Sequence, residues 1–207
     1  GYDCIILPGT KNTVDDLADL KQSGAADEIR RARGWGVPII GICGGYQMLG
    51  REIVDGGIES GVPATHAGLG LLDVVTRFAC YEKTTVQVQR RARPVGPILS
   101  SMGEVTGYEI HMGETERGTS PEAFAGEGAA SPDGLVFGTY MHGLFQNASA
   151  INALLALLYA RKGEAYEPLG DGPGAGAPGV DGAYDDLAEH FERHVDMNFI
   201  ASLFNDG

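Results

Sequence analysis

The sequence predicts an α/β fold in which a mostly parallel sheet is flanked by helices, with an antiparallel extension and a C-terminal helical cap. Three observations support this prediction. Apolar segments of strand length alternate with helix-like segments in the first quarter of the chain, as in a β-α-β unit. Segments in the middle alternate with period two, which is typical of half-exposed strands. A long amphipathic helical pattern follows near residue 150.

Composition limits the classes of function. The chain has 207 residues, which fits one α/β domain with an appendage. Its 28 acidic residues outnumber 15 basic ones, and the net charge of −13 argues against nucleic acid and membrane surfaces as partners. Cys4, Cys43 and Cys80 are widely spaced and odd in number, which favours a reduced, cytoplasmic protein over a disulfide framework. No apolar run reaches membrane-spanning length.

The chain begins with a predicted strand followed by two predicted helices. Residues 3–7 are mostly apolar and end at Pro8-Gly9, which indicates a buried strand and then a turn. Asn12 or Thr13 can cap a helix whose first turn is acidic. A second helical segment spans about 25–33. The apolar face of the first helix would consist of Val14, Leu17 and Leu20.

A cysteine lies on the predicted turn between the second strand and the helix that follows it. Residues 37–40 form an apolar strand, and Cys43 follows within a glycine-rich turn. The pattern Gly-x-Cys-x-Gly is the sulfur version of a nucleophile elbow, in which small neighbours allow the turn to close. The amino end of the following helix would favour the thiolate, which is the reactive form. The glycines of the turn are Gly41, Gly44 and Gly45.

An alternative interpretation of Cys43 is a small buried hydrophobe, which is the usual role of a free cysteine. Three flanking glycines after an apolar strand make this interpretation the less favoured one. In a β-α-β unit the carboxyl ends of the parallel strands meet on one rim of the sheet, where ligands bind. We therefore expect the backbone N–H groups of the loop at Gly9 and Thr10 to face the sulfur of Cys43.

The middle of the chain is predicted to be an antiparallel extension of the parallel core. Residues 51–63 are rich in glycine and are expected to be irregular, and residues 113–134 are expected to form a polar loop. Strands are expected at 68–75, 84–89, 105–111 and 134–141.

The C-terminal part divides into a helix, a connection and a cap. Residues 149–162 give the clearest helical pattern, and Gly163 ends it. The core domain is therefore expected to cover 1–162. Residues 163–183 are rich in glycine and proline, so we expect a flexible connection there. Residues 184–207 carry apolar residues at helical spacing and are expected to dock as a helical cap.

A histidine is needed as the base for a cysteine nucleophile. His142 directly follows an apolar strand and would lie on the functional rim, although a structural hydrogen bond is an equally good interpretation of this residue alone. His111 ends another predicted strand and either lines the same pocket or braces a turn. His190 and His194 are four residues apart, but no third ligand is evident, so we predict no metal site. His66 is assigned no role.

Three blocks of sequence together resemble the glutamine amidotransferase domain of cobyric acid synthases, the CobQ type of cobalamin biosynthesis. The blocks are Ile-Ile-Leu-Pro-Gly-Thr-Lys-Asn-Thr at 5–13, Gly-Ile-Cys-Gly-Gly-Tyr-Gln-Met-Leu-Gly at 41–50, and Gly-Thr-Tyr-Met-His-Gly-Leu-Phe at 138–145. Gly-Tyr-Glu-Ile-His-Met-Gly at 107–113 and the segment 184–197 are also similar to that family. The resemblance therefore covers nearly the whole chain.

The resemblance implies a class I glutamine amidotransferase with a flavodoxin-like fold. In such a domain Cys43 would attack the side-chain amide of glutamine, and His142 would act as general base and acid. The resulting thioester would be hydrolysed to release ammonia. The backbone N–H groups of Gly9, Thr10 and Gly44 would hold the oxyanion. Gln47 and His111 would help to shape the glutamine pocket.

Two departures from the wider class matter. Ordinary class I amidotransferases carry a glutamate two residues after the histidine, whereas this chain has Leu144 there, as the resembled family does. Glu109 is then a candidate to orient His142. Whole cobyric acid synthases also have an N-terminal ATP-dependent synthetase domain and an additional first strand before this point. The chain begins at Gly1, not Met, and lacks a Walker-type loop, so we expect a fragment of a longer protein.

The partners expected from the resemblance are glutamine and the synthetase domain of the same protein. ATP, Mg²⁺ and the corrinoid substrate are expected at that domain only, and no cofactor is expected here. Three alternatives stay open: the amidotransferase subunit of lipid II isoglutaminyl synthase, a Cys–His γ-glutamyl hydrolase or peptidase, and an inactive fragment with an open sheet edge. The block at 5–13 and the C-terminal helix favour the cobyric acid synthase type.

Overall fold

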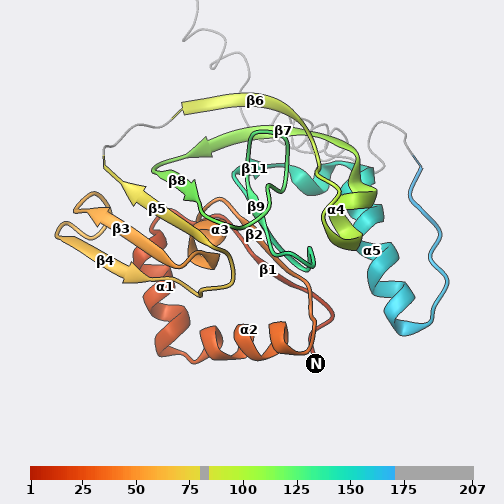
Figure 1. Ribbon diagram of the computed structural model, residues 1–207, viewed down its shortest axis with the longest axis horizontal. Coiled ribbons are helices and arrows are strands. Elements are labelled where there is room, and N and C mark those ends of the chain that lie inside the picture. The colour runs from red at the N-terminus through yellow and green to blue at the C-terminus, as the bar shows by residue number, and fades with distance from the viewer. Residues whose placement is uncertain (80–83, 171–207) are drawn as a thin grey trace, which may run out of the picture.

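The computed structural model describes residues 1–79 and 84–170 and has a four-stranded central sheet (Figure 1). The strand order is β1-β2-β10-β9. Strands β1 (Ile5–Leu7), β2 (Ile39–Ile42) and β10 (Val136–Thr139) are parallel, and β9 (Ala129–Ala130) pairs antiparallel with β10. The carboxyl ends of the three parallel strands lead directly into the loop at Gly9, Cys43 and the segment that carries His142.

Helices cover both faces of the central sheet, as expected for an α/β fold. The buried residues of α1, α2 and α3 belong to one hydrophobic cluster, and those of α4 and α5 belong to a second. Ile39 lies in the first cluster and Ile40 in the second, because successive strand residues face opposite sides. The helices are α1 (Thr13–Gln22), α2 (Ala25–Gly34), α3 (Gly44–Leu49), α4 (Gly96–Met102), the short 3-10 helix η1 (Leu144–Gln146) and α5 (Ala148–Lys162).

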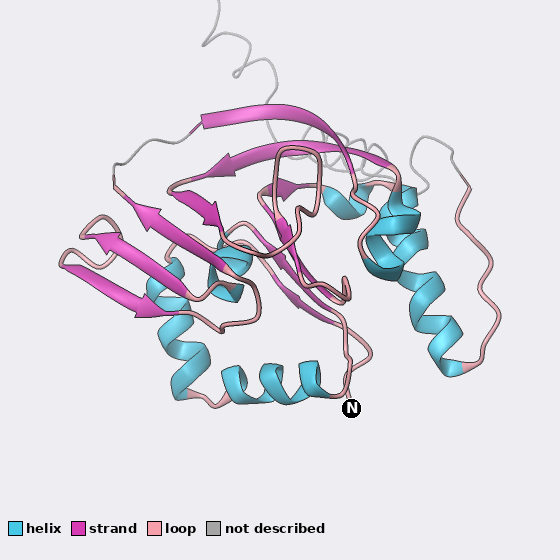
Figure 2. Cartoon of the chain, in the orientation of Figure 1, coloured by secondary structure: helices cyan, strands magenta, loops and turns pink. Residues whose placement is uncertain are grey.

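Two further sheets extend the core. One has the order β4-β3-β5-β8, in which β3 and β5 are parallel and the other pairs antiparallel. The other has the order β11-β7-β6 and is antiparallel, and Figure 2 shows its two long strands arching over the rest of the domain. The strands are β3 (Glu52–Gly56), β4 (Pro63–Ala67), β5 (Val74–Phe78), β6 (Thr84–Arg91), β7 (Glu104–His111), β8 (Glu114–Arg117) and β11 (Met141–His142).

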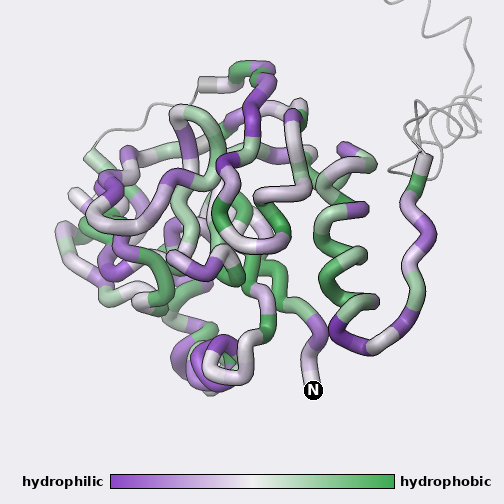
Figure 3. Tube along the Cα trace, turned by 45° about the vertical axis from the view of Figure 1, so that its right-hand side comes forward, coloured by the Kyte–Doolittle hydropathy of each residue, from purple (hydrophilic) through white to green (hydrophobic). Residues whose placement is uncertain are grey.

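Several expected elements are confirmed. Asn12 is the N-cap of α1, since its side chain accepts the N–H of Asp15 at 3.1 Å. Gly163 ends α5 with a φ of 72°, a left-handed conformation that glycine adopts at little cost. Figure 3 shows hydrophobic segments gathered toward the middle of the fold, with many of the hydrophilic ones around its outside. In the described part of the chain, no helix is both long and apolar enough to cross a membrane.

The expectation that residues 51–63 are irregular is wrong. This segment contains β3 and the beginning of β4, which form a hairpin. The connection between them is ordered by Asp55, whose carboxylate accepts the backbone N–H groups of Gly57, Ile58, Glu59 and Ser60. Because β4 is mostly exposed, it lacks the apolar alternation by which a half-buried strand is predicted.

Two other expectations need correction. Residues 113–134 are not one loop, because they contain the short strands β8 and β9. The expected strand at 68–75 begins only at Val74, since residues 68–73 are irregular. Between β6 and β7 lies the helix α4, in which Pro97 occupies the first turn, where its missing N–H costs no hydrogen bond. The predictions for 171–207, together with Cys80, lie outside the described residues.

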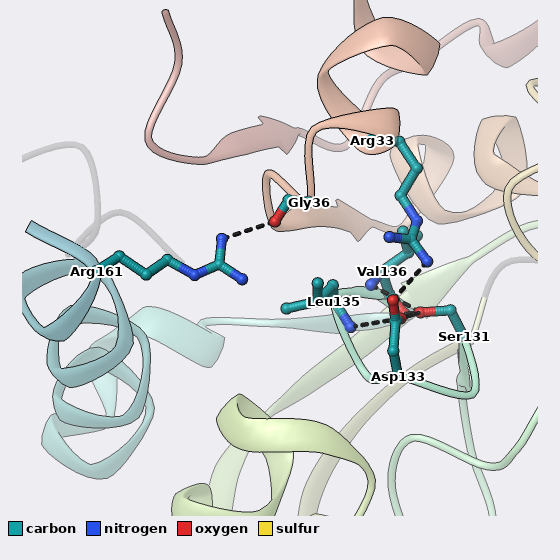
Figure 4. Close-up of polar contacts among 7 residues, drawn as sticks. All are labelled: Arg33, Gly36, Ser131, Asp133, Leu135, Val136 and Arg161. Carbon is teal, nitrogen blue, oxygen red and sulfur yellow. Dashed lines mark hydrogen bonds and ion pairs between the residues drawn. The ribbon is translucent and has the colours of Figure 1, made fainter.

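At the amino ends of the parallel strands, polar contacts join the helices to the sheet (Figure 4). Arg33 at the end of α2 forms an ion pair of 2.7 Å with Asp133, just before β10. Arg161 on α5 donates to the carbonyl of Gly36, just before β2, at 2.6 Å. These contacts fix both helices at the end of the sheet opposite to the cysteine.

Candidate active site

Cys43 occupies a strained turn between β2 and α3. Its φ of 51° and ψ of −112° make it the one non-glycine residue with positive φ in the described chain. Neighbouring positions allow no side chain: a Cβ on Gly41 would lie 2.7 Å from the N of Tyr46, and one on Gly45 would lie 2.1 Å from the O of Leu7. Such a backbone costs on the order of 1–3 kcal/mol and typically persists at functional sites. The predicted elbow is therefore present.

Gly9 lies between Cys43 and His142. A Cβ built on Gly9 would lie 3.1 Å from Cε1 of His142 and 3.5 Å from Cβ of Cys43. Gly9 and Cys43 follow the parallel strands β1 and β2, and His142 lies in β11, which comes directly after the parallel strand β10. The three residues therefore meet at the carboxyl ends of the parallel strands. A side chain at Gly9 would therefore crowd the imidazole of His142 and contact Cys43.

The loop after β1 and the beginning of α3 meet beside Cys43. The N–H of Gly44 is the first of α3, so it has no acceptor within that helix. A Cβ on Gly44 would lie 3.2 Å from the N of Thr10, which places these two backbone segments against each other. Gly45 donates to the carbonyl of Pro8 at 3.1 Å and so fixes the loop relative to the elbow. The arrangement suits an anion-binding site beside Cys43.

The ring of His142 is held by an aromatic stack. Tyr108 lies opposite His142 in the pairing of β7 with β11, and the two rings are 5.6 Å apart with planes 6° from parallel. Within the described residues we find no carboxylate hydrogen-bonded to this imidazole. Leu144, at the position where ordinary class I enzymes carry a glutamate, is 1% exposed and belongs to the hydrophobic core.

The expectation that Glu109 orients His142 is wrong. In the pairing of β7 with β11, Glu109 lies opposite Met141, and so on the other face of the ribbon from His142. Its carboxylate instead accepts the Nε and Nη2 groups of Arg90 at 3.0 and 2.9 Å. Glu109 therefore forms an ion pair with Arg90 and makes no contact that would orient His142.

Gln47 is buried beside the nucleophile, with 3% of its surface exposed. Its amide oxygen accepts the Thr13 hydroxyl at 3.0 Å, and its amide nitrogen donates to the Met112 carbonyl at 2.9 Å and to the Tyr140 hydroxyl at 3.1 Å. Gln47 thus joins the elbow to the loop after β7 and to the segment before His142.

The end of β7 also reaches the nucleophile. The Cys43 thiol donates to the carbonyl of Ile110 at 3.3 Å, so the backbone next to His111 lies at the sulfur. Two cavities open at the rim, of about 430 Å³ and 270 Å³. Gly9 and Thr10 line the larger cavity, and His142 lines the smaller one.

Sequence reasoning missed Glu127. Its carboxylate is buried and accepts the Thr139 hydroxyl and the Tyr140 N–H, each at 2.6 Å. Burial raises the pKa of Glu127 to about 7, although these hydrogen bonds oppose the rise. The available signal was weak: one acidic residue between Gly126 and Gly128, in a segment of small residues expected to be a loop.

Comparison with known proteins gives consistent results. The family of CobB/CobQ-like glutamine amidotransferase domains matches residues 1–150. The "Probable cobyric acid synthase" of Methanoculleus marisnigri is 68% identical over 206 residues, covering 100% of this chain and 42% of the relative. That of Methanoregula boonei is 60% identical over 203 residues, covering 98% and 41%. The chain thus spans about two fifths of these curated relatives.

Solved structures agree on the fold. PurLQS from Thermotoga maritima matches with a TM-score of 0.55 and 19% identity, over 76% of this chain and 80% of that one. A crystal structure of a glutamine amidotransferase matches with a TM-score of 0.51 and 16% identity, over 79% and 80%. At these identities the likeness concerns the arrangement of strands and helices, which is that of the glutamine amidotransferase fold.

Proposed function

The chain belongs to the family of CobB/CobQ-like glutamine amidotransferase domains, and from this membership we propose that it is the glutamine-hydrolysing part of a cobyric acid synthase. Two supports are independent of each other. Relatives with that name match the chain over nearly its whole length. The single observation that carries the chemistry is that Cys43 and His142 lie beside the same residue: a Cβ on Gly9 would lie 3.5 Å from Cβ of Cys43 and 3.1 Å from Cε1 of His142.

In the proposed reaction, the Cys43 thiolate attacks the side-chain carbonyl carbon of glutamine. The carbonyl oxygen becomes an oxyanion, and the N–H groups of Gly44 and of the loop at Gly9 and Thr10 donate hydrogen bonds to it. His142 delivers a proton to the amide nitrogen, the carbon–nitrogen bond breaks, and ammonia leaves. The γ-glutamyl thioester on Cys43 is then hydrolysed by a water that His142 deprotonates, which releases glutamate and regenerates the thiol.

The remainder of the proposed activity belongs to the rest of the polypeptide. Since the chain spans about two fifths of its relatives, we propose that the other part is an ATP- and Mg²⁺-dependent synthetase, which uses the ammonia to amidate corrinoid carboxylates. Placing the ATP-dependent step outside these 207 residues is in accordance with their sequence, which contains no Walker-type nucleotide-binding loop. A cytoplasmic setting is proposed for the same protein, in accordance with the wide spacing and odd number of its three cysteines.

A glutamine-mimicking electrophile such as 6-diazo-5-oxo-norleucine tests the proposal in the whole polypeptide. Mass spectrometry should find the label on Cys43, with protection by glutamine and much slower labelling in His142→Asn. Cys4 is an internal control, because burial raises the pKa of its thiol to about 11 and keeps it protonated. Equal labelling of Cys4 and Cys43, or none on Cys43, would contradict the assignment.

A further inference from the structure

We propose that Glu127 is a positioning residue for the glutaminase reaction: its carboxylate holds the chain segment that fixes both Cys43 and His142. The inference rests on the proposed function of these two residues. It assigns a role to a buried carboxylate that touches neither the sulfur nor the imidazole. It also answers how the histidine is held in a site where Leu144 stands at the position of the usual orienting glutamate.

The contacts of Glu127 are directed at the junction between β10 and β11. One carboxylate oxygen accepts the Thr139 hydroxyl, and the other accepts the backbone N–H of Tyr140, both at 2.6 Å. Thr139 is the last residue of β10, and β11 begins two residues later with Met141 and His142. A carboxylate is suited to this place because it offers two acceptors at a fixed separation.

Thr139 forms hydrogen bonds both to the backbone of the nucleophile and to the strand that carries His142. Its carbonyl accepts the N–H of Cys43 at 2.8 Å, so it holds the backbone of the elbow. Its hydroxyl oxygen accepts the N–H of Met141 at 3.0 Å, so it also holds the residue before His142. A single carboxylate is thereby connected, through one threonine, to the amide of the nucleophile and to the strand of the base.

The loop that presents Glu127 is itself fixed. Glu127 and Phe124 exchange two backbone hydrogen bonds of 2.9 and 3.0 Å. Arg117 donates to the carbonyl of Gly128 at 3.1 Å, and a Cβ at Gly128 would lie 2.5 Å from the O of Gly138. The loop therefore runs directly against β10, which lets a glutamate side chain reach Thr139. A group on a loop fixed by such contacts positions its partner more precisely than one on a free loop.

The placement of the carboxylate is costly for folding, which favours a specific role. Glu127 is 8% exposed, and burying a carboxylate without a cation bonded to it is unfavourable. Arg90 is the nearby cation, but it forms hydrogen bonds to Glu109, and Glu109 repels Glu127. An apolar side chain would fill the same space without this penalty, yet it could not hold Thr139 and Tyr140.

The test compares two substitutions in the whole polypeptide with a matched control. Glu127→Gln keeps the size of the side chain but cannot accept both the Thr139 hydroxyl and the Tyr140 N–H with its single oxygen. Thr139→Val keeps the shape and removes the hydroxyl only. The control is Glu122→Gln, on the same loop, whose carboxylate pairs with Arg93 and Arg117 instead. Each kcat is normalised to the number of sites that the electrophile labels, so unfolded protein does not count.

We expect kcat for glutamine hydrolysis to fall roughly 10- to 100-fold in Glu127→Gln and Thr139→Val, since small displacements of reacting groups have effects of this size. KM should change less than about threefold, and Thr139→Ser should recover most of the activity. Glu122→Gln should match the wild type. A kcat within twofold of wild type for Thr139→Val overturns the inference, even where Glu127→Gln does not fold.

The two hypotheses fail differently. If Cys43→Ala still hydrolyses glutamine, the proposed function itself is wrong. If Cys43→Ala is inactive while Glu127→Gln and Thr139→Val turn over like wild type, only the role of Glu127 is wrong. A merely structural role would lower the thermal unfolding temperature of both variants and leave kcat per labelled site unchanged.

Discussion

The two ends of the central sheet differ in how deeply their polar side chains are buried. At the amino end, partly exposed charged side chains bond to each other and to nearby groups: Arg33 pairs with Asp133, which also accepts hydrogen bonds from the Ser131 hydroxyl and the Leu135 N–H (Figure 4). At the carboxyl end, the polar side chains that hold the backbone are buried. There, Glu127 bonds to the junction before His142.

The difference shows which interactions matter for stability and which for chemistry. Arg33 and Asp133 are 27% and 46% exposed, so their ion pair contributes little to the free energy of unfolding. The carboxyl end instead carries a strained Cys43 and a buried Glu127 whose hydrogen bonds go to Thr139 and Tyr140 and not to a cation, and both features lower stability. These costs fall at the rim of the sheet where the reaction is proposed to occur.

The largest expected effect comes from removing the nucleophile. Cys43→Gly and Cys43→Ala should both lower glutaminase activity by at least about a thousandfold. Alanine keeps the backbone strain at a φ of 51°, whereas glycine releases it. We therefore expect Cys43→Gly to be about 1 kcal/mol more stable than Cys43→Ala by thermal unfolding, the reverse of the usual order. If Cys43→Ala were instead the more stable of the two variants, the backbone of the elbow would carry no strain.

The pH dependence of the free energy of unfolding should reveal the raised pKa of Glu127. Its pKa is about 7 in the folded protein against an ordinary 4.5, so the folded state keeps a proton that the unfolded chain releases. The free energy of unfolding should therefore fall as pH rises from about 4.5 to about 7, by on the order of 3 kcal/mol from this group. Glu127→Gln should remove that contribution. Identical pH profiles for wild type and variant, from denaturant titrations, would refute the burial argument.

A methyl group at Gly9 should disturb the site without disturbing the fold. In Gly9→Ala the new carbon would lie 3.1 Å from Cε1 of His142, so the imidazole must shift by a few tenths of an ångström. We expect kcat to fall roughly tenfold, measured as ammonia release. The matched control is Gly34→Ala at the end of α2, where a Cβ meets nothing within 4 Å. Equal kcat in both variants would argue against crowding of His142 by a side chain at Gly9.

The smallest effect is expected at the amino end of the sheet. Arg33→Gln removes the ion pair with Asp133 but leaves the hydrogen bonds of Asp133 within its own turn. The free energy of unfolding should fall by less than about 1 kcal/mol, and less still at high salt. Glutamine hydrolysis should be unchanged. A marked loss of kcat in this variant would break the contrast between the two ends.

Local patterns in the sequence were sufficient for the elements that decide the rim. The glycines around Cys43 and the caps of α1 and α5 each have one local physical cause, so the elbow and both helices were predictable. The position of Glu127 depends instead on β9 pairing beside β10, which no local pattern shows. The wrong prediction that Glu109 orients His142 also comes from strand pairing, because the register of β7 with β11 decides which face of the ribbon Glu109 occupies.

The most direct test of the central claim is to detect the covalent intermediate. The whole polypeptide is mixed with glutamine, quenched in acid within one turnover, digested and analysed by mass spectrometry. The account predicts that the peptide containing Cys43 gains one glutamyl group and that Cys43→Ala gains none. Steady turnover of glutamine without any adduct on Cys43, or with the adduct on another residue, would contradict the account.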